Sequence, residues 1–132
     1  MVKPLNVGAV NKESFSLEPE LQDGRLVLRF VGNGDMEAAP TMGPYLRLIH
    51  AEAQAQSVRE VVVDMHELYF MNSSCFKAFV AWIDQVSGLG DKGYQIRIWS
   101  EPNLHWQRRS LEAMRRIAPE VVKFEPYSEA KS

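Results

Sequence analysis

The chain of 132 residues has few of the features that would tie it to an oxidising compartment, a polyanion or a membrane. Its one cysteine cannot form an internal disulfide, which fits a reducing compartment. The formal net charge is −2, so nucleic acid and anionic membrane surfaces are not expected partners. No signal peptide is evident, and no run approaches the roughly 18 apolar residues that a membrane span needs. We therefore expect a cytoplasmic protein.

Motifs of common enzyme and ligand chemistry are also lacking. The three histidines are scattered and show no metal-ligand spacing. Neither glycine-rich stretch, GNGD at 32–35 or GLGDKG at 88–93, matches a phosphate-binding motif. Glu18 and Glu20 lie in what we interpret as a turn, and they suggest no acid/base pair. We therefore expect no metal, no cofactor and no catalytic activity.

The spacing of apolar residues predicts strands that alternate with helices. Residues 14–31 contain the turn signal Asp23-Gly24 and predict two adjacent strands, the second of which should end at GNGD. The continuous apolar run EVVVDM at 60–65 is typical of a strand covered on both faces. The other predicted elements are helices over 41–56, 74–86 and 103–117, and strands over 94–99 and 121–124.

This order, ββαβαβαβ, predicts an α/β protein with three main helices and a mixed, mostly parallel central sheet of about five strands. The length predicts a single domain over 1–132, with an ordered core at about 14–127. The first dozen residues and the tail SEAKS are polar and expected to be loose. Binding sites in such sheets favour the exposed ends where strands lead into helices.

The stretch YFMNSSCFK at 69–77 places three small nucleophilic side chains where the second helix should begin. Asn72 or Ser73 can cap that helix, because asparagine and serine oxygens accept hydrogen bonds from its first N–H groups. A phosphate on a serine there would also meet free N–H groups and the positive end of the helix dipole. The cap and a phosphorylation switch are therefore compatible interpretations.

Cys75 could act as a nucleophile, because helix N-termini lower thiol pKa values. Catalysis would need a base, and the histidine nearest in sequence is His66, with no sign that it faces the thiol. Most lone cysteines are buried hydrophobes, and we favour that role. Phe76 is expected in the core, whereas Trp82 lies at the edge of the apolar stripe and could be a half-exposed docking anchor.

The helix predicted over 103–117 is rich in arginine and could meet an acidic partner. Glu112 is spaced to pair with several of these arginines, so a salt-bridged, solvated face is the simpler interpretation. The arginines are Arg108, Arg109, Arg115 and Arg116. The core side of this helix is predicted to hold Leu104, Leu111, Met114 and Ile117.

The segment EVVVDMHELYFMNSSCFKAFVAWI resembles the central segment of STAS domains, the fold of bacterial anti-sigma-factor antagonists. In that family a buried strand ends in an aspartate, here Asp64, and an apolar spacer leads to Asp-Ser-Ser/Thr-Gly at the start of a helix. Upstream, LVLRFVGNGD resembles the second strand of the family, with Gly32 and Asp35 in the matching places. The resemblance covers roughly residues 14–127.

The resemblance implies a non-enzymatic bacterial regulator that binds an anti-sigma factor or serine kinase and is reset by a phosphatase. Ser73 falls on the phosphoacceptor of the family, and Ser74 is the less favoured neighbour. The implied partner-binding residues surround them and comprise Gly34, Asp35, Met36, Met71, Asn72, Ser74, Cys75, Lys77 and Trp82.

Two positions depart from the family pattern, because Asn72 stands for its aspartate and Cys75 for its glycine. The first change removes a negative charge beside the acceptor, and the second adds a side chain where a partner would approach. The alternative is therefore a divergent STAS-like scaffold, or a module that senses a small molecule or an oxidant, without a phosphoswitch. The partner, the pathway and the oligomeric state stay open.

Overall fold

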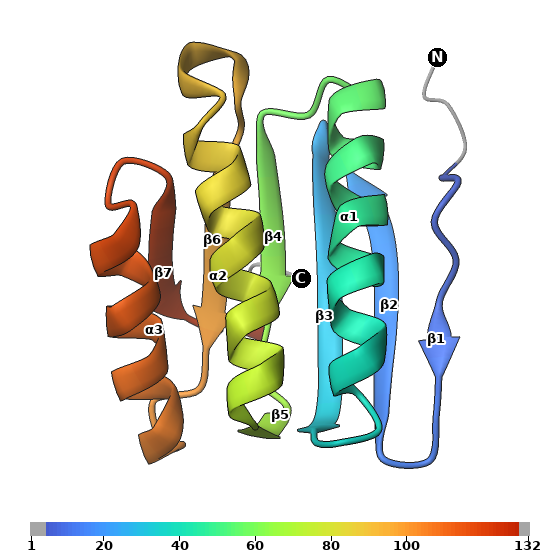
Figure 1. Ribbon diagram of the computed structural model, residues 1–132, viewed down its shortest axis with the longest axis vertical. Coiled ribbons are helices and arrows are strands. Elements are labelled where there is room, and N and C mark those ends of the chain that lie inside the picture. The colour runs from blue at the N-terminus through green and yellow to red at the C-terminus, as the bar shows by residue number, and fades with distance from the viewer. Residues whose placement is uncertain (1–4, 130–132) are drawn as a thin grey trace.

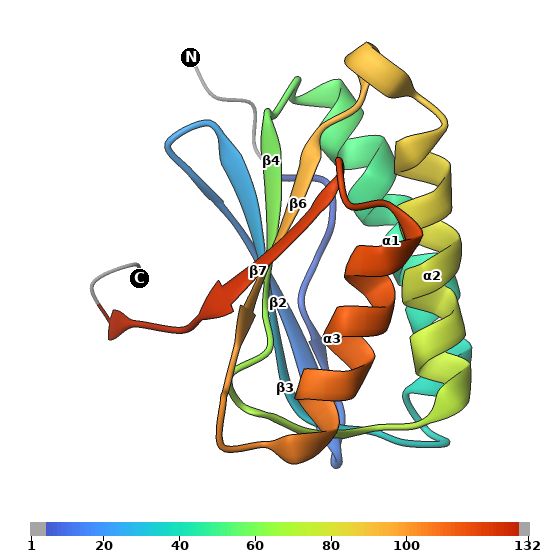
Figure 2. The same cartoon turned by 90° about the vertical axis from the view of Figure 1, so that its left-hand side faces the viewer.

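The computed structural model describes residues 5–129 and shows one twisted sheet with three helices packed on one of its faces (Figures 1 and 2). The strands run in the order β1-β2-β3-β4-β6-β7, and β5 pairs with the far end of β3. All three helices begin at the lower edge in Figure 1, beside β5. The α/β class, the three helices and the mixed sheet are confirmed.

An antiparallel hairpin precedes the parallel part of the sheet. β2 (Phe15–Gln22) pairs antiparallel with β3 (Arg25–Gly34) through the two-residue turn Asp23-Gly24, where both residues have positive φ, as such turns require. The short strand β1 (Val10–Asn11) adds antiparallel to β2. On its other side β3 pairs in parallel with β4 (Glu60–Asp64). β4 pairs in parallel with β6 (Gln95–Ser100), and β6 pairs in parallel with β7 (Val122–Pro126).

The helices lie close to their predicted ranges. They are α1 (Ala39–Ala55), α2 (Ser73–Ser87) and α3 (His105–Ile117), with a short 3₁₀ helix η1 (Gly90–Lys92) after α2. α1 begins two residues before its predicted start because Pro40 is compatible with a first helical turn. The main core fills the space between the three helices and the sheet.

The face of the sheet without helices carries a small apolar cluster of Val27, Val62 and Trp99, with Tyr127 packed against it. Around it, charged side chains form ion pairs between neighbouring strands, as in Arg97 with Glu60 at 3.0 Å. Such pairing lets one sheet face remain polar while the other is buried.

Four details differ from the sequence prediction. The strand β5 (Leu68–Met71) was not expected, and because it pairs with Gly32–Gly34, GNGD continues β3 past an irregularity instead of ending it. Glu18 and Glu20 lie in β2, not in a turn. Ile117 ends α3 and is exposed, so its place in the core was wrong.

The ends of the chain also differ in part from the prediction that they are loose. Val7 is buried in the main core, and residues 10–11 form β1, so the expectation fails for these parts of the first dozen residues. Residues 1–4 and 130–132, which the same expectation covered, lie outside the described residues.

Candidate functional site

Asn72 caps α2 and leaves both serines free. The backbone of Asn72 is extended, and its Oδ1 accepts a hydrogen bond from the N–H of Cys75 at 2.9 Å. Ser73 and Ser74 are the first two residues of the helix and are exposed. Within residues 5–129 their hydroxyl groups have no hydrogen-bond partner. Of the two predicted caps, the structure therefore shows Asn72. Modification of the Ser73 hydroxyl would break no hydrogen bond within the described residues.

Replacing Asn72 with alanine is expected to lower the free energy of unfolding by about 1 kcal/mol, because the cap of α2 is lost. Urea denaturation followed by circular dichroism measures the change. Asn72→Asp is the control, since aspartate caps helices about as well and should leave stability close to that of the parent chain. Equal losses in both variants would show that the side chain has another role.

The loop after β3 is tied directly to this junction. The N–H of Asn72 donates to the carbonyl oxygen of Gly34 at 2.7 Å, next to the pairing of Gly34 with Met71 in β5. Asp35 follows, and its Oδ1 accepts hydrogen bonds from the N–H groups of Glu37 (3.0 Å) and Ala38 (3.3 Å), which shapes the turn into α1. The predicted site residues of the two loops therefore lie side by side.

Large apolar side chains are exposed around the junction. Met36 is 86% exposed, and Tyr69 and Phe70, in β5, are 55% and 49% exposed. Met71 is partly buried, and Lys77 is exposed one turn into α2. We call Met36, Tyr69, Phe70 and Ser73 the junction surface. Large apolar side chains that remain exposed are a feature of protein-binding surfaces.

Three predicted contact residues are buried, which corrects the sequence prediction. Gly34 is covered by its pairing with β5, the side chain of Cys75 is fully buried, and Trp82 is 3% exposed. The indole Nε1 of Trp82 donates to the hydroxyl of Tyr94 at 2.8 Å, and that hydroxyl lies 2.7 Å from Nδ1 of His50. Trp82 is therefore part of the core, where a polar network satisfies its N–H group, and it offers no docking anchor.

Burial also settles the chemistry of Cys75. It raises the pKa of the thiol to about 11, and the nearby Asp35 carboxylate adds to the effect. The thiol is therefore protonated at neutral pH and unsuited to be a nucleophile or an oxidant sensor. His66 supplies no base for it, because its Nδ1 lies 2.5 Å from Oδ1 of Asp64 and its ring stacks on Tyr127 at 3.6 Å. The sequence prediction that Cys75 is a small buried side chain is confirmed.

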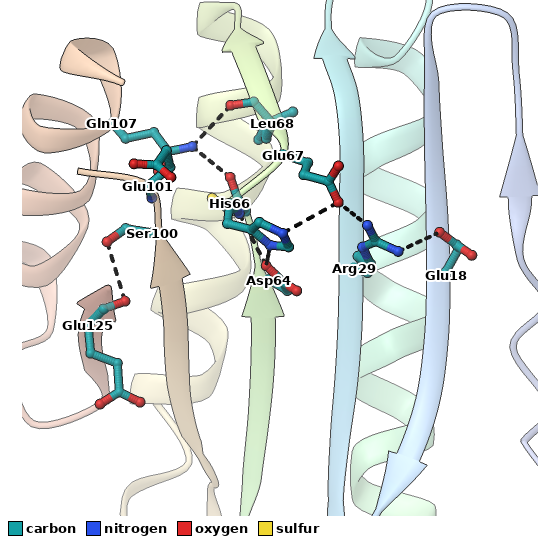
Figure 3. Close-up of polar contacts among 11 residues, drawn as sticks. Glu18, Arg29, Asp64, His66, Glu67, Leu68, Ser100, Glu101, Gln107 and Glu125 are labelled. Atoms are coloured by element: carbon teal, nitrogen blue, oxygen red, sulfur yellow. Dashed lines mark hydrogen bonds and ion pairs between the residues drawn. The ribbon is translucent and has the colours of Figure 1, made fainter. Parts of the chain in front are cut away.

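Gln107 positions the junction, although the sequence analysis did not single it out. Its side chain is buried, and Nε2 donates to the carbonyl oxygens of Met65 (2.7 Å) and Leu68 (3.0 Å), as Figure 3 shows. Its Oε1 accepts from the N–H of Glu101 at 2.8 Å. One amide thus fixes the β4–β5 loop against the start of α3. A polar residue at helical spacing before the buried Leu111 was the available signal.

The arginines of α3 divide into two groups. Arg115 and Arg116 form ion pairs with Glu112, which confirms the predicted salt-bridged face for them. Arg108 and Arg109, in contrast, have no ion-pair partner among the described residues. Spacing alone did not separate these cases, because it fixes which side chains share a face but not which rotamers they adopt.

Residues 5–129 contain no cluster of metal ligands and no helix suited to cross a membrane. No group of three or more histidine, cysteine, aspartate or glutamate side chains in this part of the chain is placed to hold a metal ion. None of the helices described here has the length and apolar character that crossing a membrane requires.

The layered arrangement of strands and helices is that of a STAS-like fold. The structure of an anti-sigma factor antagonist from Mycobacterium paratuberculosis matches with a TM-score of 0.66 and 19% identity, over 89% of this chain and 90% of that chain. The Bacillus cell fate determinant SpoIIAA in its phosphorylated form matches with a TM-score of 0.56 and 18% identity, over 89% and 95% of the two chains.

A third match is a chain in the crystal structure of the diguanylate cyclase SiaD in complex with its activator SiaC from Pseudomonas aeruginosa. The TM-score is 0.58 and the identity 16%, over 89% of this chain and 96% of that chain. No protein-family model and no curated protein matches the sequence. At these identities the likeness establishes the fold, and the expectation of a STAS-like fold is confirmed.

Proposed function

We propose that this protein is a non-enzymatic bacterial regulator that binds a partner protein through the junction surface and is switched by phosphorylation of Ser73. The observation that carries the proposal is that Ser73 is exposed with an uncommitted hydroxyl, because Asn72 caps the helix in its place. Exposed Met36, Tyr69 and Phe70 provide apolar area for a partner beside it.

A phosphate on Ser73 would be compatible with the fold but would weaken binding of the partner. It adds about −1.5 to −2 charges at the start of α2, where the helix dipole and free N–H groups favour an anion. Lys77 is four residues further along the helix, on the same face, and can pair with it. The same charge would have to lose water when a partner covers the apolar groups around it, so phosphorylation weakens docking.

The partner we propose is an anti-sigma factor or a serine kinase that acts in the cytoplasm, with a phosphatase that restores the serine. Support comes from the fold, which this chain shares with proteins described as anti-sigma factor antagonists. The cysteine in place of the family glycine does not obstruct such docking, because its side chain points into the core and adds nothing to the surface. Ser74 is the second choice of acceptor.

A photo-cross-linking amino acid at two positions tests the surface. Placed at Phe70, it should capture one defined protein in the cells of origin, and adding Ser73→Glu should reduce the yield by at least about tenfold, the result of losing roughly 1.4 kcal/mol of binding. Leu48 is the matched control, since it is an exposed apolar residue on α1, 54% exposed, away from the junction. Equal capture from both positions, or capture insensitive to Ser73→Glu, would contradict the proposal.

A further inference from the structure

A groove of about 210 Å³ lies between the start of α3 and β7, the strand at one edge of the sheet (Figure 2). Its apolar lining consists of Pro102, Leu104, Leu111, Phe124 and Pro126. Leu111 is buried, Leu104 and Phe124 are half-buried, and the two prolines are exposed. The groove shares no residue with the junction surface, so it does not depend on the proposed phosphorylation.

The size of the groove favours a side chain of another protein over a free small molecule. Most small-molecule sites have volumes of roughly 300 to 1,000 Å³, which is more than this groove offers. Protein-binding surfaces commonly have an apolar centre, a charged rim and a pocket that one side chain of the partner fills. The groove has the apolar centre, and the charged rim is provided by the first turns of α3.

Arg108 is the basic residue of the groove. It is exposed and has no ion-pair partner among residues 5–129, and the same holds for its neighbour Arg109. The first turn of α3 contains no acidic residue, although the N-terminal end of a helix already carries a partial positive charge. Two uncompensated arginines close to this end run against local preference, and proteins keep such departures mainly at functional sites.

The two carboxylates of the groove residues do not neutralise Arg108. Glu101 accepts a hydrogen bond at 2.9 Å from a backbone N–H of its own loop, which precedes α3. Glu125 is paired with Trp99 in the sheet and shares the helix-free face with it, where Oε1 of Glu125 lies 3.6 Å from Nη1 of Arg97. The carboxylate of Glu125 is therefore directed away from α3. Arg108 is left available for an acidic group of a partner.

We propose that this groove binds a segment of a partner protein in which carboxylates flank one large apolar side chain. The apolar side chain fills the space between Leu104, Leu111 and Phe124. A flanking carboxylate forms a charge-assisted pair with Arg108, whose planar guanidinium suits such an acceptor. An acidic protein segment fits better than nucleic acid, because the centre of the groove is apolar and the whole chain carries a net charge of −2.

Three acetylated and amidated peptides test this inference. The probe is Glu-Asp-Leu-Glu, while Gln-Asn-Leu-Gln lacks its charges and Glu-Asp-Ala-Glu lacks its large apolar side chain. Each peptide is titrated into the isotope-labelled whole chain, and NMR follows the backbone amide signals of Leu104, Arg108, Leu111 and Phe124. The probe should give saturable shifts at these residues. Each altered peptide should bind at least about fivefold more weakly, since it lacks either the charged pairs or the buried apolar group.

Arg108→Gln should weaken binding of the probe at least about fivefold, and because the side chain is exposed the fold should stay intact. Arg47→Gln is the matched control and should leave binding unchanged, since Arg47 is also an exposed helical arginine without an ion-pair partner among the described residues. No saturable shift up to about 10 mM, or equal effects of the two substitutions, would overturn the inference. A short DNA duplex that binds through Arg108 more tightly than the probe would also overturn it, because the surface would then serve a polyanion.

Discussion

Gln107→Leu is expected to lower the free energy of unfolding by about 3 to 5 kcal/mol. The change keeps the size of the side chain but removes both hydrogen-bonding groups of a buried amide. The carbonyl oxygen of Leu68 and the N–H of Glu101 then lose this partner, whereas the carbonyl oxygen of Met65 keeps the N–H of Leu68 at 3.0 Å. Each buried unsatisfied group costs about 1 to 3 kcal/mol. Chemical denaturation with urea, monitored by circular dichroism, measures the loss.

Gln95→Leu is the matched control for this variant. Gln95 is exposed at the start of β6, so the same chemical change there should alter stability by less than about 0.5 kcal/mol. We also expect Gln107→Leu to loosen β5, because Leu68 begins that strand, and amide hydrogen exchange at residues 68–71 should become faster. A stability change as small as that of the control would show that the amide is dispensable.

Ser73→Asp is expected to weaken partner binding by at least about tenfold while slightly stabilising the chain. A carboxylate in the first turn of α2 interacts favourably with the helix dipole, by about 0.3 to 1 kcal/mol. The same charge beside exposed Tyr69 and Phe70 opposes their burial by a partner. Opposite signs for stability and binding separate this effect from simple unfolding. Pull-down with the partner captured by cross-linking, and urea denaturation, measure the two quantities.

Ser73→Ala and Ser74→Asp are the controls. Ser73→Ala removes a hydroxyl without a partner among the described residues and should retain binding. Ser74→Asp places the same charge one residue later, about 100° around the helix, and should weaken binding less than Ser73→Asp does. If Ser74→Asp had the larger effect, the phosphoacceptor would have to be reassigned to Ser74.

The alternating strands and helices could be predicted because each leaves a local signal. EVVVDM has three successive valines at its centre because β4 is central in the sheet and covered on both faces. Asp23-Gly24 is a turn signal that the hairpin uses directly. β5 could not be separated from a loop, because four residues give no clear period and its partner, Gly32–Gly34, lies far away in sequence. Its pairing also explains why GNGD continues β3.

The candidate site could be predicted only as far as its chemistry is local. Asn72 as a cap and Ser73 as an exposed serine follow from residue types beside a helix start. The burial of Trp82 could not be predicted, because it depends on a hydrogen bond from its indole N–H to the hydroxyl of Tyr94, which lies beyond the end of α2.

The central claim is that Ser73, at the capped start of α2, is reversibly phosphorylated. The most direct test is intact-mass and fragment mass spectrometry of the protein isolated from its own cells under several growth and stress conditions. The account predicts a population that carries one phosphate, located on Ser73, whose fraction changes with condition. A chain that is unmodified in every condition, or that carries phosphate only at other residues, would contradict it.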